Sequence, residues 1–140
     1  MQKTAWIQQI TPILQSNGLA YKINTSSVDI AIIGCKDLIF QHTHLCGHIR
    51  IIYENNVFVF EMMVGYVPLA VSHVFNALIM GGVVLGGYYV FATTSNLIFL
   101  LLTIGVAVNA FCFDLNLHRK MKSVITDLKQ LIDQEKIVLT

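Results

Sequence analysis

The segment "HTHLCGH", residues 42 to 48, holds the densest group of side chains in the sequence that can bind a metal. Its members are His42, His44, Cys46 and His48. In an extended strand, alternate residues share one face and lie about 7 Å apart along it. His42 and His44 are therefore predicted to bind one metal ion. Cys46 and His48 can bind the same ion only if the chain turns near Gly47. Zinc or copper suits such ligands. The simpler interpretation is a polar strand edge that holds no cofactor.

Signatures of catalysis are not found in the sequence, which has no GxSxG, P-loop or HExxH pattern. Its carboxylates are scattered over predicted turns and strand ends rather than paired. We therefore expect a protein that is not an enzyme. His73 is the only acidic, basic or imidazole side chain between Glu61 and Asp114. We expect it to make a hydrogen bond close to one end of an apolar segment.

The composition is unusually apolar for a chain of 140 residues: 55% are hydrophobic and 12% are charged. A typical soluble domain carries about 25% charged residues. The shortage is concentrated between Glu61 and Asp114, where no Asp, Glu, Lys or Arg occurs. Each charge at the centre of a membrane helix costs roughly 2.5 to 3.5 kcal/mol on insertion scales, so this stretch suits a bilayer.

The charge balance argues against nucleic acid as a partner, since the net charge is only +1 and no basic stripe is present. The three cysteines form no CxxC pair, which favours a reduced, cytosolic setting. The N-terminus lacks the apolar region of a signal peptide. We therefore expect the N-terminal segment to stay on the cytosolic side.

Residues 1–65 are predicted to form a cytosolic α+β domain. A helix is expected over residues 4–17, shortened or kinked at Pro12 and stopped at Gly18. About four short antiparallel strands follow, with a hairpin turn at "ENNV". A unit of this size is marginal alone, so it is expected to pack on a second copy, the membrane surface or the C-terminal helix.

Residues 66–117 are predicted to form a transmembrane helical hairpin. The apolar runs 66–92 and 97–117 measure about 40 Å and 30 Å as helices, enough to cross a hydrocarbon core of about 30 Å. "ATTSN" is then a short outer turn. Arg119, Lys120 and Lys122 follow the second run, which places that end in the cytoplasm. The chain is thus expected in the cytoplasmic (inner) membrane with both termini in the cytosol.

Polar and small residues are predicted to pack the helices of this hairpin. Asn76 and Asn109 fall at a similar depth, so their amides are expected to meet. The small residues are expected to allow close approach of the helices, or of a second protomer. They are Ala77, Gly81, Gly82, Gly86 and Gly105.

Residues 118–140 are predicted to contain a cytosolic amphipathic helix. Its apolar stripe is expected to bind a partner or to form a homodimer. The stripe consists of Met121, Val124, Ile125, Leu128, Leu131 and Ile132.

An alternative treats residues 86–102 as a buried β-hairpin. The chain would then be a soluble α+β sandwich that runs helix, strands, helix, hairpin, helix, with "YVPLAVSHVFNALI" as the middle helix. That order resembles the small type III secretion chaperone-like proteins. The resemblance implies a dimeric cytoplasmic module that binds an apolar segment of a client protein.

The favoured interpretation is a small, non-catalytic integral membrane protein. Its expected role is that of a binding, accessory, regulatory or immunity- or exclusion-type factor. The expected partner is a membrane protein or a second copy of the chain.

Overall fold

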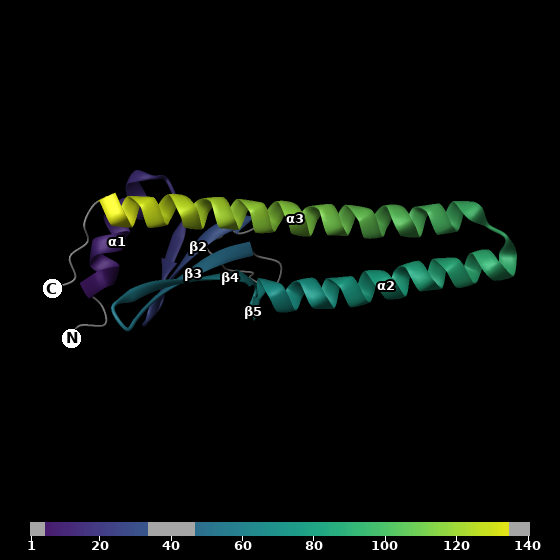
Figure 1. The fold of residues 1–140 in the computed structure, drawn as a ribbon, viewed down its shortest axis with the longest axis horizontal. Coiled ribbons are helices and arrows are strands. Elements are labelled where there is room, and N and C mark those ends of the chain that lie inside the picture. Colours follow the sequence, from purple (N-terminus) through teal and green to yellow (C-terminus); the bar gives the residue numbers. More distant parts are fainter. Residues whose placement is uncertain (1–4, 34–46, 135–140) are drawn as a thin grey trace. The chain divides into compact units, whose positions relative to one another are not determined.

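The structure, a computed structural model, describes residues 5–33 and 47–134 and has an α+β fold (Figure 1). Over these residues it contains three helices and one antiparallel sheet of five strands in the order β1-β2-β3-β4-β5. The elements are α1 (Ala5–Ser16), β1 (Tyr21–Ile23), β2 (Ser27–Ile33), β3 (Gly47–Glu54), β4 (Val57–Val64), β5 (Val67–Pro68), α2 (Leu69–Thr94) and α3 (Leu97–Gln134).

The chain divides into two compact units. We call the first the α+β unit; it comprises Met1–Pro68 and His118–Thr140. We call the second the hairpin unit; it comprises Leu69–Leu117, which is α2 and the first part of α3. The second part of α3 thus belongs to the α+β unit, as one of the three packing alternatives for residues 1–65 predicts.

Helix α1 forms because its apolar residues recur on one face. Trp6, Ile10 and Leu14 are four positions apart and all are buried. The helix has twelve residues and continues through Pro12, so it is not shortened at the proline. Gly18 ends it with φ +64°, and the Leu19 amide donates to the Leu14 carbonyl at 3.1 Å. This Schellman-type cap confirms the predicted stop.

The core of the α+β unit lies on one face of the sheet. Val28, Ile30, Ile49 and Ile51 alternate along β2 and β3 and are fully buried. Helix α1 covers this face through Trp6, whose ring centroid lies 6.3 Å from Tyr53 and 5.8 Å from Phe58.

The second part of α3 covers the same face of the sheet. Phe60 pairs with Ile51 across β3 and β4, so its side chain is on the core face. The Lys129 ammonium lies 5.6 Å from the centroid of the Phe60 ring. The sheet is therefore covered on one face by helices from both ends of the described chain.

The turn between β3 and β4 confirms the predicted hairpin at "ENNV". Asn55 and Asn56 both have positive φ, at 51° and 62°. Such turns favour Asn because it adopts the left-handed conformation at low cost. Strand β5, a two-residue strand paired with Met63 and Val64, was not predicted.

The segment 86–102 is helical on both sides of a short turn, so the alternative with a β-hairpin is wrong. Helix α2 ends at Thr94, and Ser95 has φ +56° while its amide donates to the Phe91 carbonyl at 2.7 Å. Asn96 precedes α3, and its Oδ1 accepts from the Phe99 amide at 3.3 Å. This is an N-cap, which satisfies one of the free amides at the start of a helix.

The predicted boundary at residues 117 and 118 coincides with the division between the two units, but the separate helix predicted from residue 118 is not separate. Helix α3 is continuous from Leu97 to Gln134. The composition changes at Leu117, but neither Gly nor Pro occurs between Val106 and Gln134 to end the helix.

Candidate functional site

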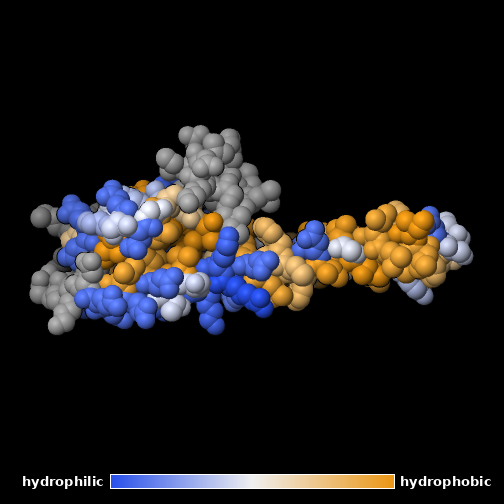
Figure 2. Space-filling view, turned by 90° about the horizontal axis from the view of Figure 1, so that it is seen from above, coloured by the Kyte–Doolittle hydropathy of each residue, from blue (hydrophilic) through white to orange (hydrophobic). Residues whose placement is uncertain are grey.

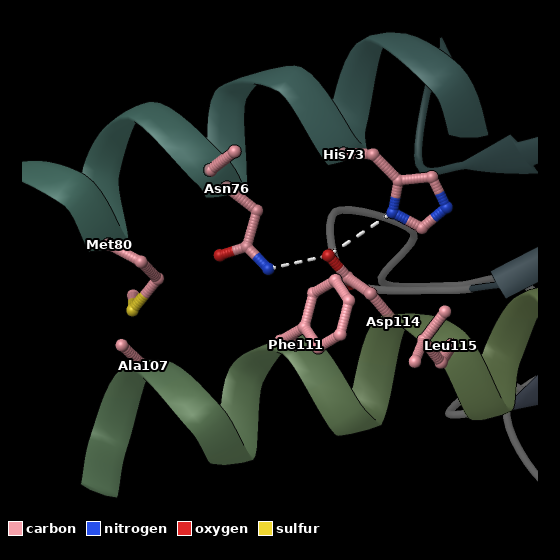
Figure 3. Close-up of a pocket in the computed structure, with 8 residues that line it drawn as sticks. His73, Asn76, Met80, Ala107, Phe111, Asp114 and Leu115 are labelled. Carbon is pink, nitrogen blue, oxygen red and sulfur yellow. Dashed lines mark hydrogen bonds and ion pairs between the residues drawn. The ribbon is translucent and has the colours of Figure 1, made fainter. Parts of the chain in front are cut away.

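A cluster of three polar side chains joins the two helices of the hairpin unit (Figure 3). We call it the polar cluster; it consists of His73 and Asn76 on α2 and Asp114 on α3. The Asn76 amide donates to Asp114 Oδ2 at 2.7 Å, and His73 Nδ1 lies 3.1 Å from the same oxygen. The side chains of His73 and Asp114 are 32% and 20% exposed, so the polar cluster is partly buried.

Helix geometry explains why these residues meet. Residues three apart lie on the same face of a helix, which brings His73 and Asn76 together on the side of α2 that faces α3. Hydrogen bonds to a charged group contribute about 1.5 to 3 kcal/mol each. The polar cluster therefore stabilises one antiparallel alignment of α2 and α3 over others.

A cavity of about 340 Å³ opens beside the polar cluster, entirely within the hairpin unit. It is lined by His73, Asn76, Ala77, Met80, Ala107, Phe111, Asp114 and Leu115. In Figure 3 the polar cluster lies toward one end of the cavity and Met80 and Ala107 lie at the other. The cavity thus has a polar end and an apolar end.

The predicted pair of Asn76 and Asn109 is not made. Asn76 donates to Asp114 instead, and Asn109 is exposed. The sequence signal for Asp114 was present, since it is the first charged residue after the charge-free stretch. Its position in the sequence marks the end of that stretch and does not indicate that it contacts α2.

Close contact between α2 and α3 occurs at a glycine that the sequence analysis did not select. A Cβ added at Gly87 would lie 2.8 Å from Thr103 Cγ2 and 2.9 Å from Thr103 Cβ. At the four predicted glycines, an added Cβ would meet nothing within 4 Å: Gly81, Gly82, Gly86 and Gly105. These four therefore do not pack the hairpin together, whereas Gly87 does. Ala77, also predicted to pack, is exposed and lines the cavity.

The predicted interaction stripe on residues 118–140 contributes largely to the core of the α+β unit. Met121 is 0%, Leu128 is 1% and Ile132 is 9% exposed. Val124, Ile125 and Leu131 are half-buried. The three most buried residues are core residues and not a surface open to a partner, because α3 packs on the sheet of its own chain.

Three of the four predicted metal ligands, His42, His44 and Cys46, lie outside the described residues. His48 is on β3 and is buried. Over residues 5–33 and 47–134, no group of three or more His, Cys, Asp or Glu side chains is placed to bind one metal ion. The metal site therefore stays a prediction.

The sheet face opposite the core carries a row of alternating charges. Lys22, Asp29, Arg50 and Glu61 are register partners on β1, β2, β3 and β4. Asp29 is 7% exposed and is held by Arg50 Nε at 3.0 Å and by the side-chain amide of Asn24 at 2.7 Å. We call this surface the charged row.

Apolar side chains cover most of the surface of the hairpin unit, as its visible face in Figure 2 shows. Leu97, Ile98 and Phe99 are consecutive and are all exposed by 44% or more. Consecutive helical residues point in different directions, so exposure extends around much of the helix. By length and composition, α2 and α3 are the two described helices that can cross a membrane.

No protein-family model, curated protein or solved structure matches the chain.

Proposed function

We propose that the chain is a small integral membrane protein whose hairpin unit crosses the cytoplasmic membrane. The exposure of the apolar helical stretch between Glu61 and Asp114 carries this proposal. A helix of comparable hydropathy in a soluble protein would be buried in its core. Here only 6% of the most apolar 18-residue window of α2 and 0% of that of α3 are buried. Lipid is the environment that covers such surfaces at the lowest free energy.

The proposed orientation keeps both ends of the chain in the cytosol. Arg119, Lys120 and Lys122 directly follow the hairpin unit, and basic residues flanking a span favour the cytosolic side. Two spans return the chain to the side from which it entered. The turn at Ser95 and Asn96 then faces away from the cytosol.

We propose that the α+β unit acts by binding and not by catalysis, as an accessory or regulatory module for a membrane protein or a second copy of the chain. The charged row supports this role. Alternating charges along a sheet face favour a partner with the complementary pattern and penalise others. Asp29, its most buried member, is already engaged by Arg50 and Asn24, so it positions the row and is not available as a general base.

Alkaline carbonate extraction of membranes from cells that produce the full chain tests membrane insertion. We expect the protein to remain in the membrane pellet, because the hairpin unit would expose its apolar surface to water if released. A protein that adheres only to the membrane surface is released by this treatment. Recovery of the full chain in the carbonate supernatant would refute the proposal.

Cysteine labelling tests the orientation in a variant from which Cys35, Cys46 and Cys112 have been removed. Thr94→Cys introduces a thiol at the end of α2, and Gln130→Cys is the matched variant in the exposed part of the α+β unit. A membrane-impermeant maleimide added to spheroplasts should label the first thiol and not the second. Inverted vesicles should give the reverse pattern. Labelling of both thiols from one side would contradict two spans.

A further inference from the structure

We propose that the cavity beside the polar cluster binds a single-chain amphiphile with a primary ammonium head. The ammonium group would lie on Asp114, and the hydrocarbon chain would lie along Ala77, Met80 and Ala107. This inference rests on the proposed membrane insertion, which makes lipid-like molecules the ones that reach the cavity.

Within residues 5–33 and 47–134, the hydrogen bond and the ion pair of the Asp114 carboxylate both involve the same one of its two oxygens. Both His73 Nδ1 and the Asn76 amide approach Oδ2. Among the described residues, neither of these interactions reaches Oδ1, the second oxygen. An ionised carboxylate offers about four acceptor positions. A charge-assisted hydrogen bond to a carboxylate is stronger than a neutral one, so a cationic donor beside Oδ1 is favoured over a neutral or anionic group.

The direction of the cavity matches that of a lipid in one leaflet. His73 and Asp114 lie near the ends of the hairpin unit, at Leu69 and Leu117, which we propose to be at the cytosolic interface. Met80 and Ala107 are each seven residues further along their helices, or about 10 Å deeper. A head group at the polar end would therefore lie near the interface, with its chain directed into the bilayer (Figure 3).

The size of the cavity favours a small molecule over a helix of a partner protein. Its volume of about 340 Å³ is at the lower end of the range of small-molecule sites, about 300 to 1,000 Å³. A partner helix would need a stripe of contacts along the hairpin unit, whereas an ammonium with one hydrocarbon chain needs only this cavity.

Calorimetric titration tests the proposal with the full chain in neutral detergent micelles and empty micelles as the blank. The probes are decylammonium, decanol and decanoate, which share a chain and differ in the head group. Both the hydroxyl and the ammonium can donate to the carboxylate, but only the ammonium adds the attraction between opposite charges, so decylammonium should bind about 10-fold more tightly than decanol. Decanoate should bind more weakly than either.

Two matched pairs of variants assign the effect to the cavity. Asp114→Asn should abolish the preference for decylammonium and leave decanol binding unchanged, whereas Asp127→Asn, at an exposed position in the α+β unit, should change neither. Ala107→Phe should weaken binding of both probes by filling the apolar end. Val108→Phe places the same ring on the exposed side of α3 and should weaken neither.

The proposal is overturned if decylammonium binds no more tightly than decanol, or if Asp114→Asn and Asp127→Asn behave alike. It is also overturned if the chain forms a dimer that Ala107→Phe disrupts, since a second copy would then occupy the cavity. These failures are distinct from failure of the membrane proposal, which is judged by carbonate extraction of the unmodified chain without any added probe.

Discussion

Replacing Gly87 by alanine should destabilise the hairpin unit, although alanine is the better helix former. A Cβ at this position would lie 2.8 Å from Thr103 Cγ2 and 2.9 Å from Thr103 Cβ. Carbon atoms make favourable contact at about 3.5 to 4.0 Å, so either the helices must separate or Thr103 must move. Rotation of the Thr103 side chain does not remove the clash with its Cβ. It would also break the hydrogen bond from Thr103 Oγ1 to the Leu100 carbonyl.

The expected magnitude follows from two opposing effects. Overpacking a tight contact costs about 1 to 3 kcal/mol. Replacement of Gly by Ala in a helix contributes up to about 1 kcal/mol in the other direction. Gly82→Ala provides the second effect alone, because its Cβ meets nothing within 4 Å. The free energy of unfolding of Gly87→Ala should therefore lie about 1 to 3 kcal/mol below that of Gly82→Ala.

The free energy of unfolding is measured by adding sodium dodecyl sulfate to the full chain in neutral micelles. Circular dichroism monitors the loss of helix during this titration. Thr103→Ala is added to each glycine variant to complete a double-mutant cycle. Thr103→Ala removes Cγ2 but keeps the Cβ that lies 2.9 Å from the new Cβ, so it should recover part of the loss in Gly87→Ala. Equal free energies of unfolding for Gly87→Ala and Gly82→Ala would refute the reasoning, as would a cycle with no coupling to Thr103.

Two further predictions concern the α+β unit, and both use the fluorescence of Trp6, the single and buried tryptophan, to follow unfolding. Asp29→Ala leaves the partly buried partners of this carboxylate without their acceptor, and we expect it to lower the free energy of unfolding by about 1 to 3 kcal/mol. The matched variant Asp127→Ala, at an exposed position, should lower it by less than about 0.5 kcal/mol. An equal loss in the two variants would show that Asp29 contributes no special stability. Leu128→Ala should lower the free energy of unfolding by about 2 to 5 kcal/mol, because Leu128 is a core residue that is 1% exposed. Gln130→Ala, at an exposed position, is the matched control. An equal loss of stability in the two variants would contradict the packing of α3 on the sheet.

Local sequence chemistry predicted the elements whose ends are determined by single residues. Gly18 stops α1 because glycine adopts positive φ without strain, and Asn55 and Asn56 turn the chain between β3 and β4 for a related reason. The turn between the two apolar helices was likewise predicted from its small polar residues. In each case the deciding interactions lie within a few residues of one another.

Contacts between helices were predicted poorly because they depend on rotation of one helix about its axis relative to another. The spacing of Gly82 and Gly86 marks a small-residue face, but Gly87, one residue further and about 100° around α2, is the residue that contacts Thr103. The partner of Asn76 was missed in the same way. The similar depth of Asn76 and Asn109 favoured that pair, whereas the packing of α2 on α3 brings Asn76 to Asp114.

The proposed membrane insertion gives a physical reason for the continuity of α3, because a helix that ended at residue 117 would then end at the edge of an apolar environment. A helix that stopped at Leu117 would leave its last four carbonyl groups without backbone partners. Near a hydrocarbon boundary such groups find little water, so each is costly to leave unpaired. If the helix continues, these carbonyl groups accept hydrogen bonds from the amides of the next turn. Only the composition of the side chains then has to change along the helix. That change occurs after Leu115, the last large apolar residue of α3 with high exposure, since Leu117, Met121 and Leu128 are buried. One backbone element can therefore serve two environments, and the composition boundary at residue 118 marks a change of surroundings and not the end of a helix.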